Sequence, residues 1–478
     1  MKKSRFFACF LALVLLFALS APFFPSARAE EISADAETVD TQPDSADAPD
    51  ETPSLLPEDP NIQARAALLI DLNRDGKLVY GKNEHDRMYP ASLTKIMTAL
   101  LVLEAVDNGE LSLDTPVTAS EIVWSMPAGS STAGIKMGET MSVRNMLYCL
   151  LVSSANEAAD ILAEQVSGTI TGFVQAMNAK AAELGCENTH FTNTHGFHDE
   201  YHYTSAWDIA LITREAMKHP AFMTICDTDR YIVPATNMSG ERTLLSTNHL
   251  ISLWRNRSFK NPEVHGVKTG STTEAGYCLV STAERGSLHF MSVVMGAEGV
   301  DADGKQTFRS FTETTRLFNW GFDNFRYASI IEEGEPLWEA PVELSWTDHV
   351  TVIASQSAQA LLPVKLSAEN LEKTIRLNSD HLSAPITAGD KLGIVELGYR
   401  GVTYGTVEVE ASHDVEVSRL KSAQKTVTDL AQKTSVRIGA GAAAAIAAVG
   451  VGVTLARKRR NRYGKSSGGS SSGYRGRR

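Results

Sequence analysis

The sequence MYPASLTKIMTAL, residues 88–100, places a serine and a lysine three positions apart in an otherwise apolar run. Pro90 and Ala91 set Ser92 at the start of a predicted helix, where backbone N–H groups lack partners and the helix dipole favours negative charge. Residues three apart on a helix touch, so Ser92 meets Lys95. A lysine in an apolar, partly dry site has a lowered pKa and can take the proton of a serine hydroxyl. We therefore interpret Lys95 as an activator of Ser92.

Two further short motifs accompany this pair. They are Ser154-Ala155-Asn156 and Lys268-Thr269-Gly270. The S-x-x-K spacing alone is a weak signal, since it recurs twice within the polar residues 418–425. The distinguishing feature is the order S-x-x-K, S-x-N, K-T-G, which is that of penicillin-binding proteins and class A β-lactamases.

On these motifs the chain resembles the D-alanyl-D-alanine carboxypeptidase family, the low-molecular-mass penicillin-binding proteins. The stretches VSSANEAADILAE, NTHFTNTHGFHDEYHYTSAWDIA and KTGSTTEAGYCLV carry the resemblance further. It implies a serine peptidase that removes the terminal D-alanine from peptidoglycan stem pentapeptides. It also implies acylation by β-lactams and a reaction without cofactor or metal.

The resemblance implies a role for each matching residue. Ser92 forms the acyl-enzyme, Lys95 is its general base and Ser154 relays protons to the leaving amine. The backbone N–H groups of Ser92 and Ser271 form the oxyanion hole. Substrate binding falls on Asn156, Lys268, Thr269, Gly270, Ser271 and Arg309.

The assignment of Arg309 departs from the family pattern. The family has an arginine ahead of its last helix that helps bind the terminal carboxylate. In TFRSFTETTRLFNWGF, Arg309 is displaced by one residue when counted back from Trp320, so that Ser310 occupies the expected position.

Apolar periodicity predicts an α/β (α+β) fold, in which an antiparallel sheet is covered by helices. We expect two strands and a turn over residues 66–82, and a second strand pair over residues 275–296. Helices are expected over residues 97–106, on either side of residues 152–156, and over residues 312–325. By resemblance, this is a β-lactamase/transpeptidase-like domain, residues 61–326. Residues 327–413 predict a small all-β domain.

Both ends of the chain predict membrane-related segments. Residues 1–29 combine a basic start, an apolar run and an A-x-A site, which is typical of a cleaved signal peptide; an uncleaved anchor is the alternative. Acidic residues 30–60 predict a disordered linker. Residues 438–456 carry no charge and predict a transmembrane helix, with a helix lying on the membrane surface as the alternative. A stalk, residues 414–437, precedes it, and the basic tail, residues 457–478, places the single span with the catalytic domain outside.

The charge of the chain bears on its binding partners, and its cysteine content bears on disulfide bonds. The net charge is −12, with eleven acids in residues 30–60 and nine bases in the last 22 residues. This acidic body argues against nucleic-acid binding. Four cysteines remain beyond the predicted signal peptide, without a C-x-x-C motif, and we expect buried free thiols. They are Cys149, Cys186, Cys226 and Cys278.

Several alternatives stay open on the sequence alone. The chain is a carboxypeptidase, a serine β-lactamase or D,D-endopeptidase of the same fold, or a non-enzymatic, membrane-tethered wall-binding protein. A β-lactamase of class A needs a further glutamate, for which residues 155–267 offer no clear counterpart. His195, His198 and His202 with Asp199 form either a metal site or, as we favour, a hydrogen-bonded loop.

Four other residues are given structural roles. Glu157 and Asp160 are expected to cap and solvate the start of a helix. Trp207 and Trp320 are expected to be core aromatics.

Overall fold

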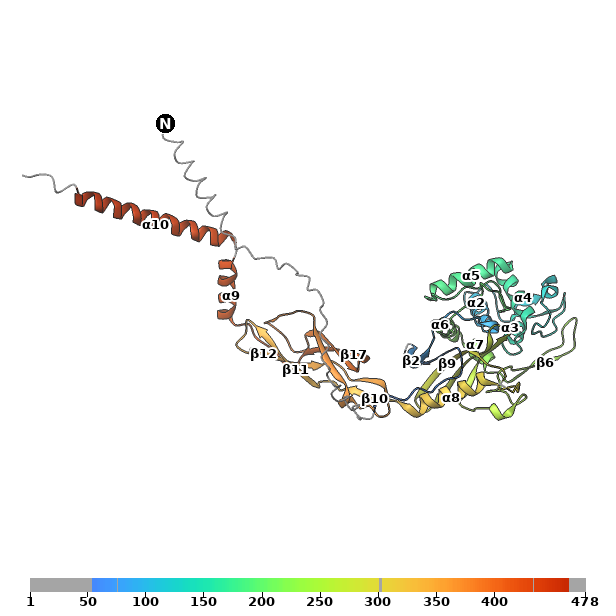
Figure 1. Ribbon diagram of the computed structural model, residues 1–478. Coiled ribbons are helices and arrows are strands. Elements are labelled where there is room, and N and C mark those ends of the chain that lie inside the picture. The colour runs from blue at the N-terminus through green and yellow to red at the C-terminus, as the bar shows by residue number, and fades with distance from the viewer. Residues whose placement is uncertain (1–53, 75, 301–302, 433, 464–478) are drawn as a thin grey trace, which may run out of the picture. The chain divides into compact units, whose positions relative to one another are not determined.

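The computed structural model describes residues 54–463, apart from 75, 301–302 and 433 (Figure 1). The predicted signal peptide, most of the acidic linker and the end of the basic tail lie outside the described residues. The last part of the predicted linker lies inside them and has defined contacts, because the carbonyl of Glu58 accepts a hydrogen bond from Trp320 Nε1 at 2.7 Å. Glu58, which the acidic composition places in the disordered linker, therefore belongs to the folded part of the chain.

A five-stranded antiparallel sheet forms the centre of the first domain, in the order β2-β1-β9-β8-β7. Both predicted strand pairs are confirmed. Strand β1, the first of the five in the sequence, lies beside β9, the last of the five. The strands are β1 (Ala66–Asp71), β2 (Lys77–Lys82), β7 (Val264–Thr272), β8 (Gly276–Arg285) and β9 (Leu288–Ala297).

Strand β1 is buried along its whole length because the sheet is covered on both faces. Side chains alternate across a strand, so neighbours enter different cores. Leu68 and Ile70 join the core beneath the large helical group, whereas Leu69 joins the core beneath α8. Figure 1 shows the sheet between these two layers. The predicted fold class is confirmed.

The predicted helices are also present, with shifted ends. The helix that follows the opening motif is α2 (Lys95–Asp107), and it is preceded by the 3-10 turn η1 (Ala91–Thr94). The remaining helices of this domain are α3 (Val143–Leu151), α4 (Asn156–Ser167), α5 (Ile170–Glu183), α6 (Ala206–Met217), α7 (Pro220–Cys226) and α8 (Arg309–Asn324). Short elements complete it: β3 (Pro116–Thr118), η2 (Glu121–Ser125), β4 (Thr140–Ser142), β5 (Arg230–Val233), β6 (Arg242–Leu245) and η3 (Arg257–Phe259).

The predicted small all-β domain is confirmed. Its apolar side chains form a core separate from those of the first domain, including Val352, Val395 and Val409. A six-stranded sheet has the order β14-β16-β17-β12-β11-β15, and β10 pairs with β13. The elements are β10 (Phe325–Ile331), β11 (Pro336–Glu343), β12 (His349–Ala354), β13 (Ala358–Pro363), η4 (Ala368–Asn370), β14 (Glu372–Leu377), β15 (Leu382–Ser383), β16 (Lys391–Tyr399) and β17 (Val402–Ala411).

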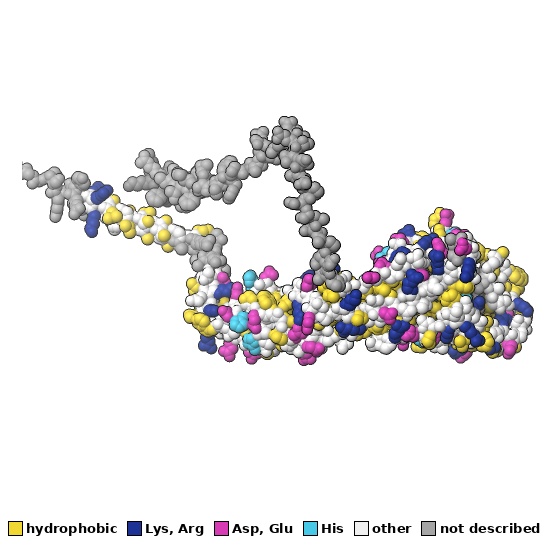
Figure 2. Space-filling view, turned by 60° about the horizontal axis from the view of Figure 1, so that its bottom comes forward, with side chains coloured by type: hydrophobic (Ala, Val, Ile, Leu, Met, Phe, Trp, Pro, Cys, Tyr) yellow, Lys and Arg dark blue, Asp and Glu magenta, His cyan; other side chains and the backbone are white. Residues whose placement is uncertain are grey.

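Two helices follow, α9 (Arg419–Gln432) and α10 (Thr434–Tyr463). Within the described residues one helical segment, Gly441–Arg460, is long and apolar enough to cross a membrane, with a mean hydropathy of 1.3. Figure 2 shows apolar side chains along this helix and a basic group at its end. The segment suggests a membrane anchor.

The four cysteines are buried free thiols, as predicted. Trp207 and Trp320 are partly buried and pack against the two cores of the first domain.

Candidate active site

Ser92 and Lys95 meet because a 3-10 turn and a helix are joined end to end. Ser92 lies in η1, and Lys95 is the first residue of α2. Lys95 Nζ lies 2.9 Å from Ser92 Oγ. The sequence-based contact is confirmed, although the turn that carries Ser92 is 3-10 and not α-helical.

The Lys95 amine has two further neighbours, and both are carbonyl oxygens. Nζ donates to Asn156 Oδ1 at 2.7 Å and to the backbone oxygen of His195 at 2.8 Å. A neutral amine has two N–H donors and one lone pair. The two carbonyls match the donors, and the Ser92 hydroxyl matches the lone pair.

The electrostatics favour this neutral form. Lys95 is completely buried. Burial lowers its pKa well below the usual value, and the nearby cation of Lys268 lowers it further, while Glu157 and Asp160 oppose the shift. A lysine in this state can accept a proton near neutral pH.

Ser154 and Lys268 form a second pair of this kind. Ser154 lies in the turn between α3 and α4 with a φ of 64°, which is an uncommon conformation for a residue with a side chain and one found at functional sites. Lys268 Nζ, buried on β7, donates to Ser154 Oγ at 2.9 Å and to the Thr269 carbonyl at 2.9 Å. Burial lowers the pKa of Lys268 to about 7.

The glycine of the K-T-G motif allows β7 to approach η1 closely. A Cβ at Gly270 would lie 2.9 Å from the Pro90 carbonyl oxygen and 3.1 Å from the Ser92 nitrogen. Both distances are shorter than ordinary contacts to a carbon atom. The backbone of β7 therefore lies beside the Ser92 N–H. An oxyanion hole needs N–H donors from two such neighbouring segments.

A cleft of about 750 Å³ unites these groups. Its lining includes Ser92, Ser154, Asn156, Thr269, Gly270 and Ser271, so the three motifs meet in one place.

Two hydroxyl-bearing residues of this cleft were not identified from motifs. Thr247 Oγ1 lies 2.6 Å from Thr269 Oγ1, and Ser310 lies at the start of α8. The hydroxyl groups of Thr247 and Thr269 thus lie side by side in the cleft, and Ser310 adds another to its lining. No sequence motif marks Thr247, whereas Ser310 was already noted at the position expected for arginine.

Arg309 does not reach this cleft. It lines a neighbouring cavity, and its Nη1 pairs with Glu298 Oε2 at 2.6 Å. None of the described residues that line the cleft is an arginine. The helix begins at Arg309 and points Ser310 inward, so the one-residue displacement seen in the sequence has a direct structural consequence.

The histidine-rich loop supports α2 through hydrogen bonds. His202 Nδ1 accepts from the Thr192 N–H at 3.0 Å, and its Nε2 lies 2.8 Å from Thr94 Oγ1. Thr94 Oγ1 in turn donates to the Ala91 carbonyl at 2.9 Å. Burial lowers the pKa of His202 to about 3, so it is a neutral ring that bridges two segments.

His195 supports the site through its backbone, which accepts from Lys95, and burial lowers its side-chain pKa to about 3. Within the described part of the chain, no three His, Cys, Asp or Glu side chains are grouped so that they could hold a metal ion.

The expectation that Glu157 and Asp160 are solvated is wrong. Both are buried. Glu157 Oε1 accepts from Thr132 Oγ1 at 2.5 Å and from the Ala133 N–H at 2.7 Å. Asp160 accepts a hydrogen bond from Thr194, next to the carbonyl that holds Lys95. These hydrogen bonds attach two loops, around Ala133 and Thr194, to helix α4.

Comparisons with known proteins agree with this geometry. A family model described as D-alanyl-D-alanine carboxypeptidase matches residues 54–299, and one described as the penicillin-binding protein 5 C-terminal domain matches residues 325–417. The D-alanyl-D-alanine carboxypeptidase DacF of Bacillus subtilis is 32% identical over 355 residues, which cover 74% of this chain and 86% of that protein. The Escherichia coli enzyme DacD is 30% identical over 346 residues, or 71% of this chain and 84% of its own.

Solved structures show the same similarity. Penicillin binding protein 5 of Haemophilus influenzae aligns with a TM-score of 0.58 and 28% identity, covering 75% of this chain and 99% of that one. The carboxypeptidase DacD of Francisella tularensis aligns with a TM-score of 0.60 and 26% identity, covering 75% of this chain and 94% of its own.

Proposed function

This chain belongs to the D-alanyl-D-alanine carboxypeptidase family and is a serine peptidase, and from that we propose that it removes the terminal D-alanine of peptidoglycan stem pentapeptides through an acyl-enzyme on Ser92. The observation that carries the proposal is the set of three neighbours around the Lys95 amine: one hydroxyl and two carbonyl oxygens. This set suits a neutral base poised on a serine nucleophile.

The first half of the reaction forms the ester. Ser92 Oγ attacks the carbonyl carbon between the two D-alanines, and its proton passes to Lys95 Nζ. The N–H groups of Ser92 and Ser271 stabilise the developing oxyanion. The C–N bond then breaks, and the proton held by Lys95 passes through the Ser154 hydroxyl to the leaving amine, which returns Lys95 to its neutral form; Ser154 Oγ is hydrogen-bonded to Lys268.

The second half releases the product. Water attacks the ester carbonyl while Lys95 takes one of its protons, the bond between the carbonyl carbon and Ser92 Oγ breaks, and Lys95 returns that proton to Ser92 Oγ. Asn156 holds Lys95 through both halves and is well placed to bond the substrate amide.

Selection of a chain end depends on the polar lining of the cleft. Thr247, Thr269 and Ser310 line the cleft and offer hydroxyls to a free carboxylate, and the buried Lys268 cation contacts the Thr269 carbonyl behind them. Charge-assisted hydrogen bonds of this kind favour a terminal D-alanine over an internal peptide bond. Because a cross-linked peptide also ends in a D-amino-acid carboxylate, endopeptidase cleavage is proposed only as a side activity.

We also propose that β-lactams acylate Ser92, since they present a strained amide beside a carboxylate. The relatives named penicillin-binding proteins support this reading. Glu274 is the one carboxylate among the described residues that line the cleft, and it lies in the turn after β7 and not beside Ser92 and Lys95. This arrangement supports slow release of the label rather than β-lactamase turnover.

The proposed location is the cell membrane, with a single C-terminal span and the catalytic domain outside. The apolar helix within Gly441–Arg460 and its basic end support this topology, as does the leader-like sequence of residues 1–29.

Two incubations test the proposed function. The protein is mixed with fluorescent penicillin and digested, and the labelled peptide should contain Ser92; Ser92→Ala should keep the fold and lose the label. Separately, release of D-alanine is measured from a pentapeptide, from its C-terminal amide and from cross-linked dimers. Dominant cleavage of the free acid is expected. A label on another serine, or equal cleavage of the amide, would contradict the proposal.

A further inference from the structure

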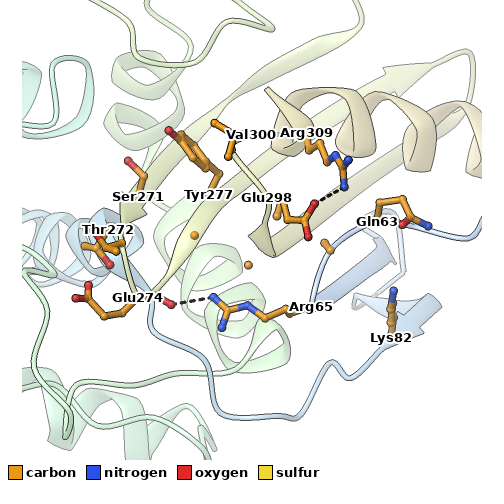
Figure 3. Close-up of a pocket in the computed structure, with 16 residues that line it drawn as sticks. Gln63, Arg65, Lys82, Ser271, Thr272, Glu274, Tyr277, Glu298, Val300 and Arg309 are labelled. Atoms are coloured by element: carbon orange, nitrogen blue, oxygen red, sulfur yellow. Dashed lines mark hydrogen bonds and ion pairs between the residues drawn. The ribbon is translucent and has the colours of Figure 1, made fainter. Parts of the chain in front are cut away.

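A second hollow, of about 1070 Å³, adjoins the active-site cleft around the turn between β7 and β8. The two share a wall made of Ser271, Thr272, Thr273, Glu274 and Tyr277. Figure 3 shows Ser271 and Tyr277 at one side of the hollow, with Arg65, Lys82 and Arg309 at the other. We call this the basic hollow. A molecule that runs along β7 beyond Ser271 enters it.

The cations of the basic hollow have few acidic partners. Arg65 Nη2 donates to the carbonyl oxygens of Glu274 and Ala275 at 2.9 and 2.7 Å. Lys82 Nζ donates to the Ile62 carbonyl oxygen at 2.7 Å. Among the described residues, neither forms an ion pair with a carboxylate, so their charges are met only by backbone dipoles.

Arg309 is the third cation, and its pairing is exchangeable. Its partner Glu298 has a side chain that is 69% exposed, compared with 31% for Arg309. Exposed ion pairs contribute little to stability, so a second anion could replace Glu298 at small cost. Glu274 and Glu298 also line the hollow, so the described residues of its lining carry three cations against two carboxylates.

The direction of a bound substrate follows from the order of groups on β7. Lys268 and Thr269, which suit the terminal carboxylate, come first, and Ser271, which suits the reacting carbonyl, comes next. The part of the peptide on the amino side of the reacting bond therefore leaves the cleft beyond Ser271. That path leads to the wall shared with the basic hollow.

We propose that the basic hollow binds a carboxylate carried by the stem peptide on the amino side of its D-Ala-D-Ala end, with Arg65 and Lys82 as the principal cations. This assignment rests on the proposed function, because it takes the peptide as substrate. The sequence position of Arg309 implied that it binds the terminal carboxylate of the substrate. The proposal instead places Arg309 near a carboxylate on the amino side of the reacting bond.

Two isosteric substrates test the proposal on the full-length protein in detergent. Both are stem pentapeptides, and they differ only at the residue that precedes the L-diamino acid, which carries either a free α-carboxylate or its primary amide. The free acid should have a kcat/KM about three- to tenfold higher than the amide, and added salt should reduce the difference. An absence of preference would overturn the proposal.

Variants separate charge recognition from structure. Arg65→Gln and Lys82→Gln keep an N–H donor for the carbonyl partners and remove the charge, so each should lower kcat/KM for the free acid and leave that for the amide unchanged. Lys218→Gln, at an exposed lysine paired with Glu215 and outside the hollow, is the matched control and should change neither value. Equal losses on both substrates would indicate a structural role and refute the assignment.

The substitution Glu298→Gln should have the opposite effect on the preference for the free acid. It releases Arg309 from its carboxylate partner, and the preference for the free acid should rise by about twofold. A fall in preference would contradict the proposed site. Failure of the proposed function itself looks different, because then neither substrate would release D-alanine and penicillin would not label Ser92.

Discussion

The amine of Lys95 has three neighbours, and their chemical types determine how it can act. Replacement with arginine keeps the positive charge and the length, but a guanidinium does not give up its proton near neutral pH. Lys95→Arg should therefore lower the rate of acylation by fluorescent penicillin by about a hundredfold or more, which is the usual size of a general-base contribution. Rapid-quench labelling measures the rate, and a circular dichroism spectrum like that of the unsubstituted protein controls for folding. Near-normal labelling would exclude the base.

The pKa of Lys268 predicts a pH limit. Burial lowers this pKa to about 7, so the cation is present below that pH and is lost above it. Since we propose that this cation attracts the substrate carboxylate, kcat/KM for a free-acid pentapeptide should decline as the pH rises through about 7 and beyond. Lys268→Arg holds its charge and should carry the decline to much higher pH. An unchanged profile in this variant would assign the limit to another group.

Single residues also show where motif reasoning stops. The three motifs identified Ser92, Lys95 and Ser154 because their chemistry depends on short spacings along the chain. Thr247 was missed since its only link to the site is a contact across space with Thr269. Glu157 was misassigned because charge alone predicts exposure, whereas donors from a distant loop, Thr132 Oγ1 and the Ala133 N–H, hold one of its carboxylate oxygens inside the protein.

At the scale of secondary structure, the close approach of β7 to η1 determines how the strand is positioned beside Ser92. A Cβ at position 270 would lie 2.9 Å from a backbone oxygen that has no room to move, because η1 is tied to α2 and to the loop around His202. Gly270→Ala should therefore displace the strand from Ser92 and reduce acylation at least tenfold, with little change in secondary structure. Thr269→Ser is the control and should keep most of the labelling. Full activity in the alanine variant would show that the approach is looser than the distances indicate.

The existence of helices and strands was predictable from periodicity, but their ends were not. The strand pairs over residues 66–82 and 275–296 follow strong apolar runs with turn residues between them. The start of α8 depends instead on Phe308, which takes a φ of 50° and fixes Ser310, not Arg309, toward the cleft. No local sequence signal predicts a positive φ at a phenylalanine.

At the scale of the whole molecule, the apolar part of α10 lies beyond both folded domains. A chain ending near Ser418 should therefore be secreted, soluble and as active toward penicillin and pentapeptide as the complete protein. Fractionation of the medium and membranes measures the first property, and labelling measures the second. Protease added to intact cells should reach the catalytic domain of the full-length protein; complete protection would contradict the proposed topology.

The order of strands in the sheet has a consequence for how the protein folds during its synthesis. Strand β1, near the start of the chain, pairs on one side with β9, which is made only after the whole helical group and β7 and β8. Such long-range pairing makes folding slow, since a large loop must close before the central contacts form. Ser92 and Lys95 are therefore synthesised long before the strands that complete their surroundings. Until β9 has been made, β1 has no partner on that side, and an unpaired apolar strand is prone to pair with other chains.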